Sequence, residues 1–526
     1  MIRYLIISLC LILTVIGAVF AQEIAQELAH DFAQETEIQI DEELSDTDIY
    51  FINSFLYESK GMTRAYAMNY KLELKVGEEI TGSRNLEKFI QDKTQILVNE
   101  RLFEIVEIEH TIGEQQEDGR YPVDMNIYVK ESWNILAIPI PKYDSNNGFE
   151  ITIKFRDNNF LGTMNPLRLD LGYRHDTEGK NYFNALLDLD FPFFLFGLNW
   201  NVNFDNEYVY RQNLEKPHFY KNTTGISVEI PVRRMVFTLG FTELFIVNEE
   251  MPDDQKPFHG NFFEGLYMSS RPSFSWGIPL GKYYYDIGEF GYSINVSATF
   301  NHEISRWPLP EFKKGPFLYF SHGIGFGRID WRGNFRRGLS VNVGNSYSVD
   351  FYNHKNDINP WGISFSISAT GHTMLGKRTG FSSRITYNHY FFNNYNDNAG
   401  SLIRGIRDGE VHANYILAIN FDLPILIFTM KPSTWSQKEK TIRFLRVFDL
   451  DFHLSPILDI GMYKRVHDQA PFGIENMLIG AGLEAFVFPL RFRSYYFRVS
   501  FAVGLQTRQM DKRTSYELFF GLGHFY

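Results

Sequence analysis

The residues of this chain that could do chemistry do not group into a catalytic or cofactor site. Residues 323–327 have the look of a nucleotide-binding loop, but their glycines recur every second residue and no helical pattern follows, so a crowded strand face is the better interpretation. His453 and His467 lack metal-ligand spacing, and no G-x-S-x-G nucleophile elbow is present. Asp449 and Asp451 would share one face of a strand, as carboxylates in a polar lumen often do. We therefore expect no enzyme activity, no cofactor and no metal.

The N-terminus has the pattern of an export signal. Arg3 precedes an apolar run over residues 5–16, and residues 19–21 read Val-Phe-Ala, which suits cleavage before Gln22. A membrane anchor is the alternative, but the run is shorter than the ~20 residues of a spanning helix. Cys10 is the only cysteine, so cleavage would leave a chain without disulfides or thiolate ligands. We predict a signal peptide over residues 1–21 and an acidic, mobile leader over residues 22–47.

The composition poses a question about where the aromatic side chains lie. The chain has 49 Phe and 30 Tyr, yet its mean hydropathy is -0.23 and no later apolar run is as long as a membrane helix. A transmembrane β-barrel answers it, because each strand alternates lipid-facing and lumen-facing side chains and is not hydrophobic on average. The formal net charge of -12 argues against nucleic acid as a partner, since such a protein needs a basic face.

The region 133–526 alternates apolar and polar residues almost throughout, which is the period of a β-strand. The clearest segments are residues 149–156, 167–174, 198–205, 292–301, 339–351 and 363–370. A soluble sandwich would turn the apolar face inward, whereas a membrane barrel turns it to lipid, and periodicity alone does not separate the two. The export signal, the aromatic content and the lack of a second layer of helices favour the membrane. The predicted fold is mostly β, a transmembrane antiparallel barrel of about 16 strands.

A small α+β domain is predicted in front of the barrel, over residues 48–132. A strand at 49–57 is followed by helical spacing at 63–74 and 85–99, and then by two alternating strands at 103–109 and 123–129. The order β-α-α-β-β resembles a polypeptide-transport-associated (POTRA) domain. Any other small α+β module is the alternative. We expect the strands near Ile105 and Ile127 to be the exposed edges of its sheet.

Three barrel segments are similar to motifs of the bacterial surface antigen family of outer-membrane assembly barrels. The stretch 403–424, IRGIRDGEVHANYILAINFDLP, resembles the Arg-Gly loop of that family and its following strand, with Ile406 where the family has an aromatic residue. Residues 457–461, ILDIG, resemble the strand that carries a lumen-facing carboxylate. The C-terminus resembles a final outer-membrane strand. The residues that match are Ile403, Arg404 and Gly405 in the loop, Asp459 and Gly461 in the strand, and Tyr516, Leu518, Phe520, Leu522 and Tyr526 at the end.

The resemblance implies that Arg404 pairs with Asp459. A guanidinium on a loop that folds into a lumen loses hydration, and a carboxylate in bidentate geometry offsets that loss. The alternative is that Arg404 is a solvated loop charge and Asp459 a wetted lumen residue. The spacing of the two residues does not decide between these interpretations.

The resemblance also implies a function without covalent chemistry. The small domain would capture unfolded outer-membrane or secreted proteins by adding their strands to a sheet edge, and the barrel would insert or translocate them. Outer-membrane lipid and periplasmic accessory proteins are further candidate partners. A passive porin or small-solute channel is the main alternative, and lipid transport or membrane-lipid assembly is another.

Overall fold

In the computed structural model the described residues are 47–144, 148–177, 179–212, 217–248, 265–281, 283, 285, 288–304, 315–355, 359–391, 397–398, 401–406, 411–435, 437–464, 476–506 and 514–522. The predicted signal peptide over residues 1–21 and nearly all of the leader over residues 22–47 lie outside them. Tyr526 of the predicted final-strand motif also lies outside the described residues.

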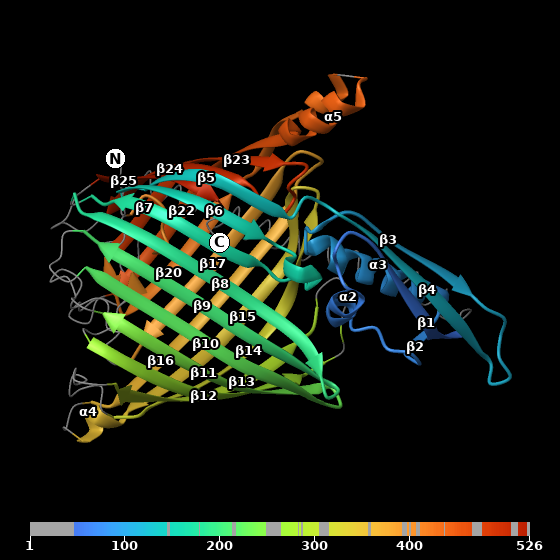
Figure 1. The fold of residues 1–526 in the computed structure, drawn as a ribbon, viewed down its shortest axis with the longest axis horizontal. Helices are drawn as coiled ribbons and strands as arrows, with labels where there is room; N and C mark the ends of the chain where they lie inside the picture. Colours follow the sequence, from blue (N-terminus) through green and yellow to red (C-terminus); the bar gives the residue numbers. More distant parts are fainter. Residues whose placement is uncertain are drawn as a thin grey trace. The chain divides into compact units, whose positions relative to one another are not determined.

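The N-terminal part is a four-stranded sheet with two helices (Figure 1). Its elements are β1 (Ile49–Lys60), α2 (Ala65–Leu72), β2 (Glu79–Thr81), α3 (Ser83–Asn99), β3 (Phe103–Ile112) and β4 (Arg120–Glu131). The predicted helices and strands are present, and β2 is an addition. The apolar face of α3 is buried at Leu86, Phe89 and Leu97, and Val123 and Ile127 of β4 are fully buried. The alternating and helical apolar periods therefore supply the core of this part.

The strand order β2-β1-β4-β3 corrects one expectation about the edges. β3, which contains Ile105, is an edge strand, but β4, which contains Ile127, lies between β1 and β3. Every second residue of β4 from Val123 to Val129 is buried, which identifies its core-facing side, whereas its central place follows from its pairing with both β1 and β3. Asp124, on the opposite face of β4, accepts hydrogen bonds from Asn53 Nδ2 at 2.8 Å and Ser54 Oγ at 2.5 Å.

The chain divides into two compact units, and their border crosses this sheet. One unit contains described residues 47–57, 73–93 and 108–127, and the other contains residues 58–72, 94–107 and those from 128 onward. β4 ends at Glu131 and β5 begins at Ile135. A domain border at residue 132 and the independent folding of residues 48–132 stay predictions.

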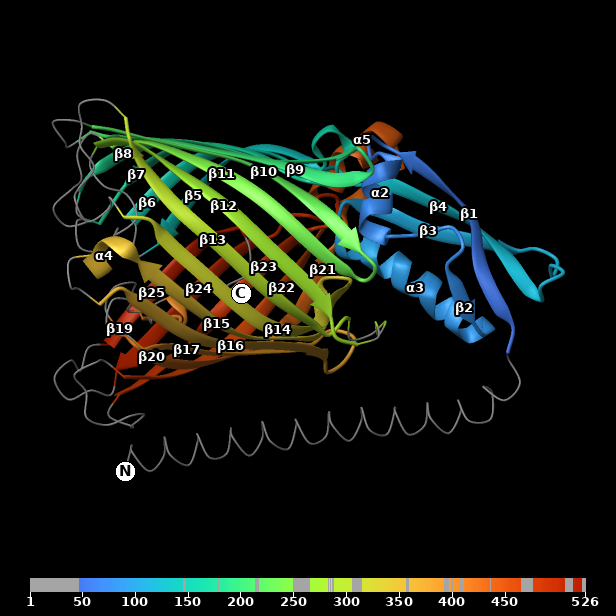
Figure 2. The same cartoon turned by 90° about the horizontal axis from the view of Figure 1, so that it is seen from below.

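The rest of the chain is a closed antiparallel barrel with tilted strands (Figures 1 and 2). Its strands are β5 (Ile135–Asp144), β6 (Gly148–Asp157), β7 (Leu167–His175), β8 (Asn181–Leu195), β9 (Leu198–Arg211), β10 (His218–Val232), β11 (Met235–Asn248), β12 (Gly265–Pro279), β13 (Gly291–Glu303), β14 (Phe317–Arg332), β15 (Phe335–Asp350), β16 (Trp361–Met374), β17 (Gly380–Tyr390), β20 (Tyr415–Asp422), β21 (Ile425–Met430), β22 (Leu450–Lys464), β23 (Met477–Pro489), β24 (Phe497–Gln506) and β25 (Thr514–Leu522).

The barrel has more strands than the expected number of about sixteen. Of these nineteen segments, β20 and β21 both pair with β22 in one continuous direction and are two pieces of a single strand, so the described residues form eighteen strands. The interruption is at Leu423 and Pro424, where proline has no N–H to donate. Turns of two residues, such as 196–197, 233–234 and 333–334, leave chain length for the extra hairpin.

The two faces of the barrel wall differ as a membrane protein requires. Ile226, Leu239 and Phe241 lie on neighbouring strands and are exposed on the outside. The opposite row of β22 is buried and includes Ser455 and Asp459. An exposed apolar belt around a buried polar interior is the arrangement of a transmembrane barrel and not of a sandwich.

The barrel closes between β25 and β5 through few residues. Among the described residues this boundary has two pairs, Phe519 with Asp144 and Phe520 with Tyr143. The adjacent boundary between β24 and β25 extends from Phe497 to Leu505. The closure is therefore the less extensively hydrogen-bonded of the two boundaries of the final strand.

Helical segments interrupt the predicted strand period in several places. They are η1 (Phe160–Gly162), α4 (Phe351–Lys355), η4 (Pro432–Trp435), α5 (Glu439–Leu445) and η5 (Arg446–Phe448). The alternation predicted over residues 133–526 is wrong there, because the flanking strands end and the chain leaves the wall. None of the helices in the described part is long and apolar enough to cross a membrane.

Candidate functional site: a lumen loop bound to the barrel wall

Residues 401–406 form the candidate site, and we call them the lumen loop. They belong to the long connection between β17 and β20, which also contains the two-residue strands β18 (Asp397–Asn398) and β19 (His412–Ala413). Ile403 and Ile406 are fully buried, and Arg404 is 2% exposed. A loop so deeply buried needs partners for its backbone and its charge, and the inner face of the barrel wall provides them.

Arg404 contacts Asp459 through three hydrogen bonds. Its Nε donates to Asp459 Oδ2 at 2.9 Å and its Nη2 to Oδ1 at 2.7 Å, which is the bidentate geometry, and its backbone N–H donates to Oδ2 at 2.8 Å. Asp459 has no exposed surface. The structure thus brings together the two residues that the sequence motifs paired, and neither is solvated.

The remaining guanidinium nitrogen of Arg404 faces two more carboxylates. Arg404 Nη1 lies 2.6 Å from Asp422 Oδ1 and 3.4 Å from Glu484 Oε1. Glu484 Oε1 also lies 3.3 Å from Arg498 Nη1. A single arginine is therefore surrounded by three carboxylates from β20, β22 and β23, and a second arginine on β24 balances part of the negative charge. The hydrogen bonds to Asp459 fix the orientation of the guanidinium, and the ion pairs with Asp422 and Glu484 add electrostatic attraction.

Glycines on the wall allow the backbone of the loop to approach. A Cβ at Gly480 would collide with the carbonyl of Arg404, and a Cβ at Gly504 would collide with the carbonyl of Gly405. Gly405 has a φ of 88°, and a Cβ there would lie 2.6 Å from Gly504 N. The predicted residue Gly461 lies against Ile403, since a Cβ would be 3.0 Å from its side chain. Glycine is required at residues 405, 480 and 504 because the backbones of the loop and wall approach each other so closely there.

The loop also contacts the final strand. Gly405 N–H donates to Glu517 Oε2 at 3.0 Å, and Ser515 Oγ donates to the carbonyl of Gly405 at 2.5 Å. On the other side, Asn420 Nδ2 donates to the carbonyl of Leu402 at 2.8 Å. The lumen loop thus connects the inner faces of β20, β22, β23, β24 and β25.

An apolar cluster completes the loop's attachment. Its members are buried and come from the connection and from β20, β22 and β23; they are Leu402, Ile403, Ile406, Val411, Ala413, Ile416, Ala418, Tyr463 and Leu478. Burial of these side chains favours docking of the loop, and the ionic network sets its position.

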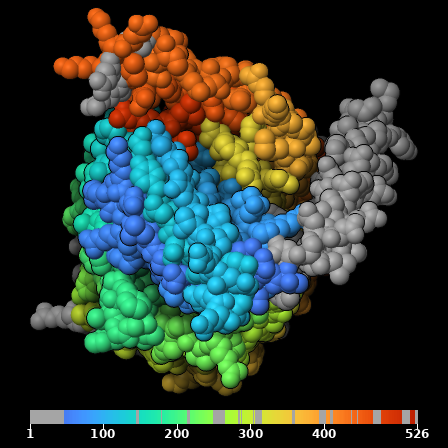
Figure 3. Space-filling model, turned by 90° about the vertical axis from the view of Figure 1, so that its right-hand side faces the viewer, coloured from blue at the N-terminus to red at the C-terminus, as the bar shows by residue number. Residues whose placement is uncertain are grey.

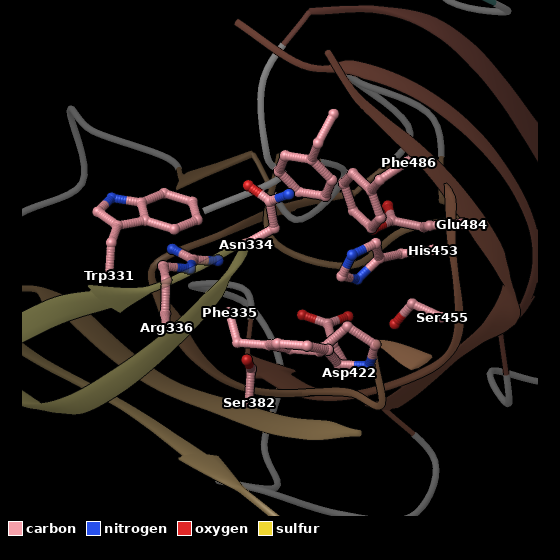
Figure 4. A pocket seen from close by; sticks show the side chains of 12 residues that line it. Trp331, Asn334, Phe335, Arg336, Ser382, Asp422, His453, Ser455, Glu484 and Phe486 are labelled. Atoms are coloured by element: carbon pink, nitrogen blue, oxygen red, sulfur yellow. The ribbon is translucent and has the colours of Figure 1, made fainter. Parts of the chain in front are cut away.

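A small cavity adjoins the ionic network. Figure 4 shows Asp422, His453, Ser455 and Glu484 around it. The ring of His453 lies between those of Phe335 and Phe488, with 4.9 Å between centroids in each case. In the part of the chain that the structure describes, no group of three or more His, Cys, Asp or Glu side chains could hold a metal ion. The arrangement can hold a loop by charge and shape.

Sequence reasoning missed Glu484, Arg498 and Glu517. A signal was present, because each is the only charged residue of its strand, on β23, β24 and β25 in turn. A lone charge in an otherwise apolar or small-residue strand favours a specific partner in the lumen. Three such strands in succession indicate one shared site.

The described residues of the predicted final-strand motif lie on β25. Tyr516 and Leu518 are exposed on the outer face of β25, at 55% and 36%, and Phe520 is half-buried. Leu522 is the last residue of β25. Tyr516 and Leu518 therefore do not contribute to the lumen site.

The sequence matches no protein-family model, and no curated protein matches it. Solved structures with a similar course of the chain include CdiB from Acinetobacter baumannii, with 10% identity, a TM-score of 0.47 and coverage of 90% of this chain and 74% of that one. BamA from Haemophilus ducreyi lacking POTRA domains 1–3 has 14% identity, a TM-score of 0.39 and coverage of 89% and 84%. CdiB from Escherichia coli has 10% identity, a TM-score of 0.41 and coverage of 90% and 91%. At these identities, the roles of individual residues depend on this chain's own contacts.

Proposed function

We propose that this protein is an outer-membrane barrel of the bacterial surface antigen type that inserts or translocates other proteins. Its N-terminal domain would lie in the periplasm and bind unfolded clients. The observation that carries the proposal is the lumen loop, which fastens five consecutive wall strands up to the final strand, whose boundary with β5 has two residue pairs among the described residues. A passive pore has no need for this arrangement beside its closure.

The free edge of β3 supports client capture. β3 is ten residues long and lies at the edge of the small sheet, whereas the other edge, β2, has three residues. Most of the second half of β3 is exposed. An extended segment of an unfolded protein can add to such an edge through main-chain hydrogen bonds, whatever its sequence.

The closure between β25 and β5 supports insertion at that boundary. Opening it breaks fewer main-chain hydrogen bonds than opening the neighbouring boundary, because two residue pairs are present among the described residues. The contacts of Gly405 with Glu517 and Ser515 would hold β25 in place meanwhile. A client strand could then pair with a wall edge that keeps its position.

Depletion of the protein, followed by quantitation of the outer-membrane proteome, tests the proposal. We expect a subset of outer-membrane or secreted proteins to fall while periplasmic proteins stay constant. Expression of the wild-type chain should restore them, and a chain with Arg404→Ala should restore them poorly.

Other outcomes would favour the alternatives. An unchanged proteome with lost uptake of a small solute, together with steady conductance of the purified protein in planar bilayers, would indicate a porin. An unchanged proteome with altered outer-membrane lipid would indicate lipid transport.

A further inference from the structure

The helical segment between β21 and β22 has features that neither the barrel wall nor the lumen loop requires. We call residues 431–449 the rim insert; it contains η4, α5 and η5. In Figure 1 the segment labelled α5 projects beyond the wall of strands, and the orange surface containing it protrudes in Figure 3. It connects the same ends of the strands as the short turns 196–197, 233–234 and 333–334 do.

The rim insert is locally ordered by its own hydrogen bonds. Ser433 N–H and Oγ donate to the carboxylate of Asp449 at 3.0 and 2.6 Å, which ties the start of the insert to its end. Ile442 N–H donates to the carbonyl of Lys438 at 2.9 Å. The insert is therefore a built structure that presents particular side chains.

The charge of the rim insert is opposite to that of the chain. Residues 431–449 contain five Lys or Arg and two Asp or Glu, whereas the whole chain has a formal net charge of -12. Lys431, Lys440 and Arg446 are exposed. The neighbouring turn adds Lys377 and Arg378, both exposed, and Arg378 Nη2 donates to the carbonyl of Ile427 on β21 at 2.9 Å. The positive surface thus continues from the insert to the next turn.

Large apolar side chains are exposed on the same segment. Trp435 is 72% exposed, and Val447 and Phe448 are 38% and 48% exposed. Ile427 and Phe428 of β21, immediately before the insert, are also exposed. Exposed tryptophan and aliphatic side chains together with lysines and arginines are typical of segments that lie at a membrane interface.

We propose that the rim insert lies on the surface of the bilayer and binds the anionic headgroups of its phospholipids. The proposal rests on the membrane-barrel part of the proposed function. Lipid is the occupant that fits, because the apolar surface continues into the barrel wall and the positive charge complements phosphate. The basic side chains attract anionic headgroups within about a Debye length, roughly 8 Å at physiological salt, and Trp435 enters the boundary between headgroups and acyl chains.

A spin label on the insert tests the proposal. Cys10 is the only cysteine, so the full chain with Cys10→Ser and Trp435→Cys carries one label. It is reconstituted into bilayers of phosphatidylcholine alone or with phosphatidylglycerol, and collision rates with oxygen and with a water-soluble nickel complex are compared. We expect the oxygen-to-nickel ratio to rise several-fold with phosphatidylglycerol and to fall again in 1 M salt.

Two controls make the result specific. In the first, Phe196→Cys places the label in a turn at the same barrel end that has no basic residue, and Phe196 is 87% exposed; its ratio should not depend on phosphatidylglycerol. In the second, Lys431→Gln, Lys440→Gln and Arg446→Gln are added to the Trp435→Cys chain, and the dependence should disappear.

The outcomes separate this proposal from the function proposed above. If the chain forms a barrel in bilayers but the label at residue 435 stays in water in both lipids, the rim insert does not bind the membrane. If the lipid dependence survives the three glutamine substitutions, headgroup charge is not what the insert recognises. If the chain does not enter bilayers at all, the membrane-barrel assignment itself is wrong.

Discussion

Replacing Arg404 with alanine should destabilise the barrel strongly. The change removes two side-chain hydrogen bonds to Asp459 and the ion pairs with Asp422 and Glu484. Asp459 is then left as a carboxylate with 0% exposure, and Glu484, with 2% exposure, keeps only its contact with Arg498. Removing one partner of a buried ion pair typically costs about 3–5 kcal/mol. We expect a loss in this range in the free energy of unfolding.

Equilibrium unfolding by guanidinium chloride in detergent micelles, followed by tryptophan fluorescence, measures the loss. Arg168→Ala is a matched control, because Arg168 Nη1 lies 3.1 Å from Asp188 Oδ2 while the two side chains are 50% and 31% exposed. An exposed pair contributes about 0–1 kcal/mol, so the control should unfold almost like the wild type. Arg404→Lys should recover little stability, since an ammonium cannot make the planar two-pronged contact.

A double-mutant cycle with Asp459→Ala decides whether the contact itself is responsible. Residues in one ionic network couple by roughly 0.5–3 kcal/mol, so the double variant should be more stable than the sum of the single effects predicts. The reasoning is refuted if the effects of Arg404→Ala and Asp459→Ala simply add, or if Arg404→Ala unfolds like the Arg168 control.

Four other predictions concern the loop, the barrel and the small domain. Gly480→Ala and Gly504→Ala should expel the lumen loop and expose a cysteine that replaces the buried Leu402 to a thiol reagent, whereas Gly376→Ala, with no atom within 4 Å of its added Cβ, should not. The folded protein should migrate faster in unboiled than in boiled detergent gels; equal migration with a helical circular dichroism spectrum would contradict the barrel. A fragment of residues 48–132 should be soluble and unfold cooperatively, and insolubility or disorder would count against an independent domain. Hydrogen bonds from Ser54 and Asn53 lower the pKa of Asp124 in the folded state. Asp124 therefore stabilises the fragment above its unfolded pKa of about 3.9, and this stabilisation is lost as the pH falls through the lower folded pKa. In a pH series of thermal melts, Asp124→Asn should reduce the loss of stability in acid.

The sequence predicted the fold class well because alternation is a local property. The barrel segments with period two, such as 149–156 and 198–205, lie in observed strands, except that Phe351 at the end of 339–351 begins α4. The number of strands was underestimated because two-residue turns such as 196–197 leave little signal between consecutive strands. The helical rim insert was missed because its short helices lie between strongly alternating strands and carry no long apolar period.

The site was predictable only in its motif residues. Arg404, Gly405, Asp459 and Gly461 could be named from the resemblance, but their environment depends on register. Register places Glu484 opposite Ser455 and next to the strand of Arg498, and neither spacing nor composition contains this information. The same limit explains the error about Ile127, because edge and centre positions in a sheet follow from strand order and not from the alternation of one strand.

The contacts of the lumen loop have a consequence for the order of folding. Arg404 and Asp459 are 55 residues apart, and Gly405 and Glu517 are 112 residues apart. Closing such long segments has an entropic cost that must be met before the contacts form, and the partner on β25 belongs to the last strand of the barrel. The loop can therefore complete these contacts only after the C-terminal strands have assembled, late in folding. Interactions that form late in folding change mainly the rate of unfolding and have little effect on the rate of folding. We therefore expect Arg404 to determine how long a folded barrel persists, while the pairing of the strands sets how fast the barrel assembles.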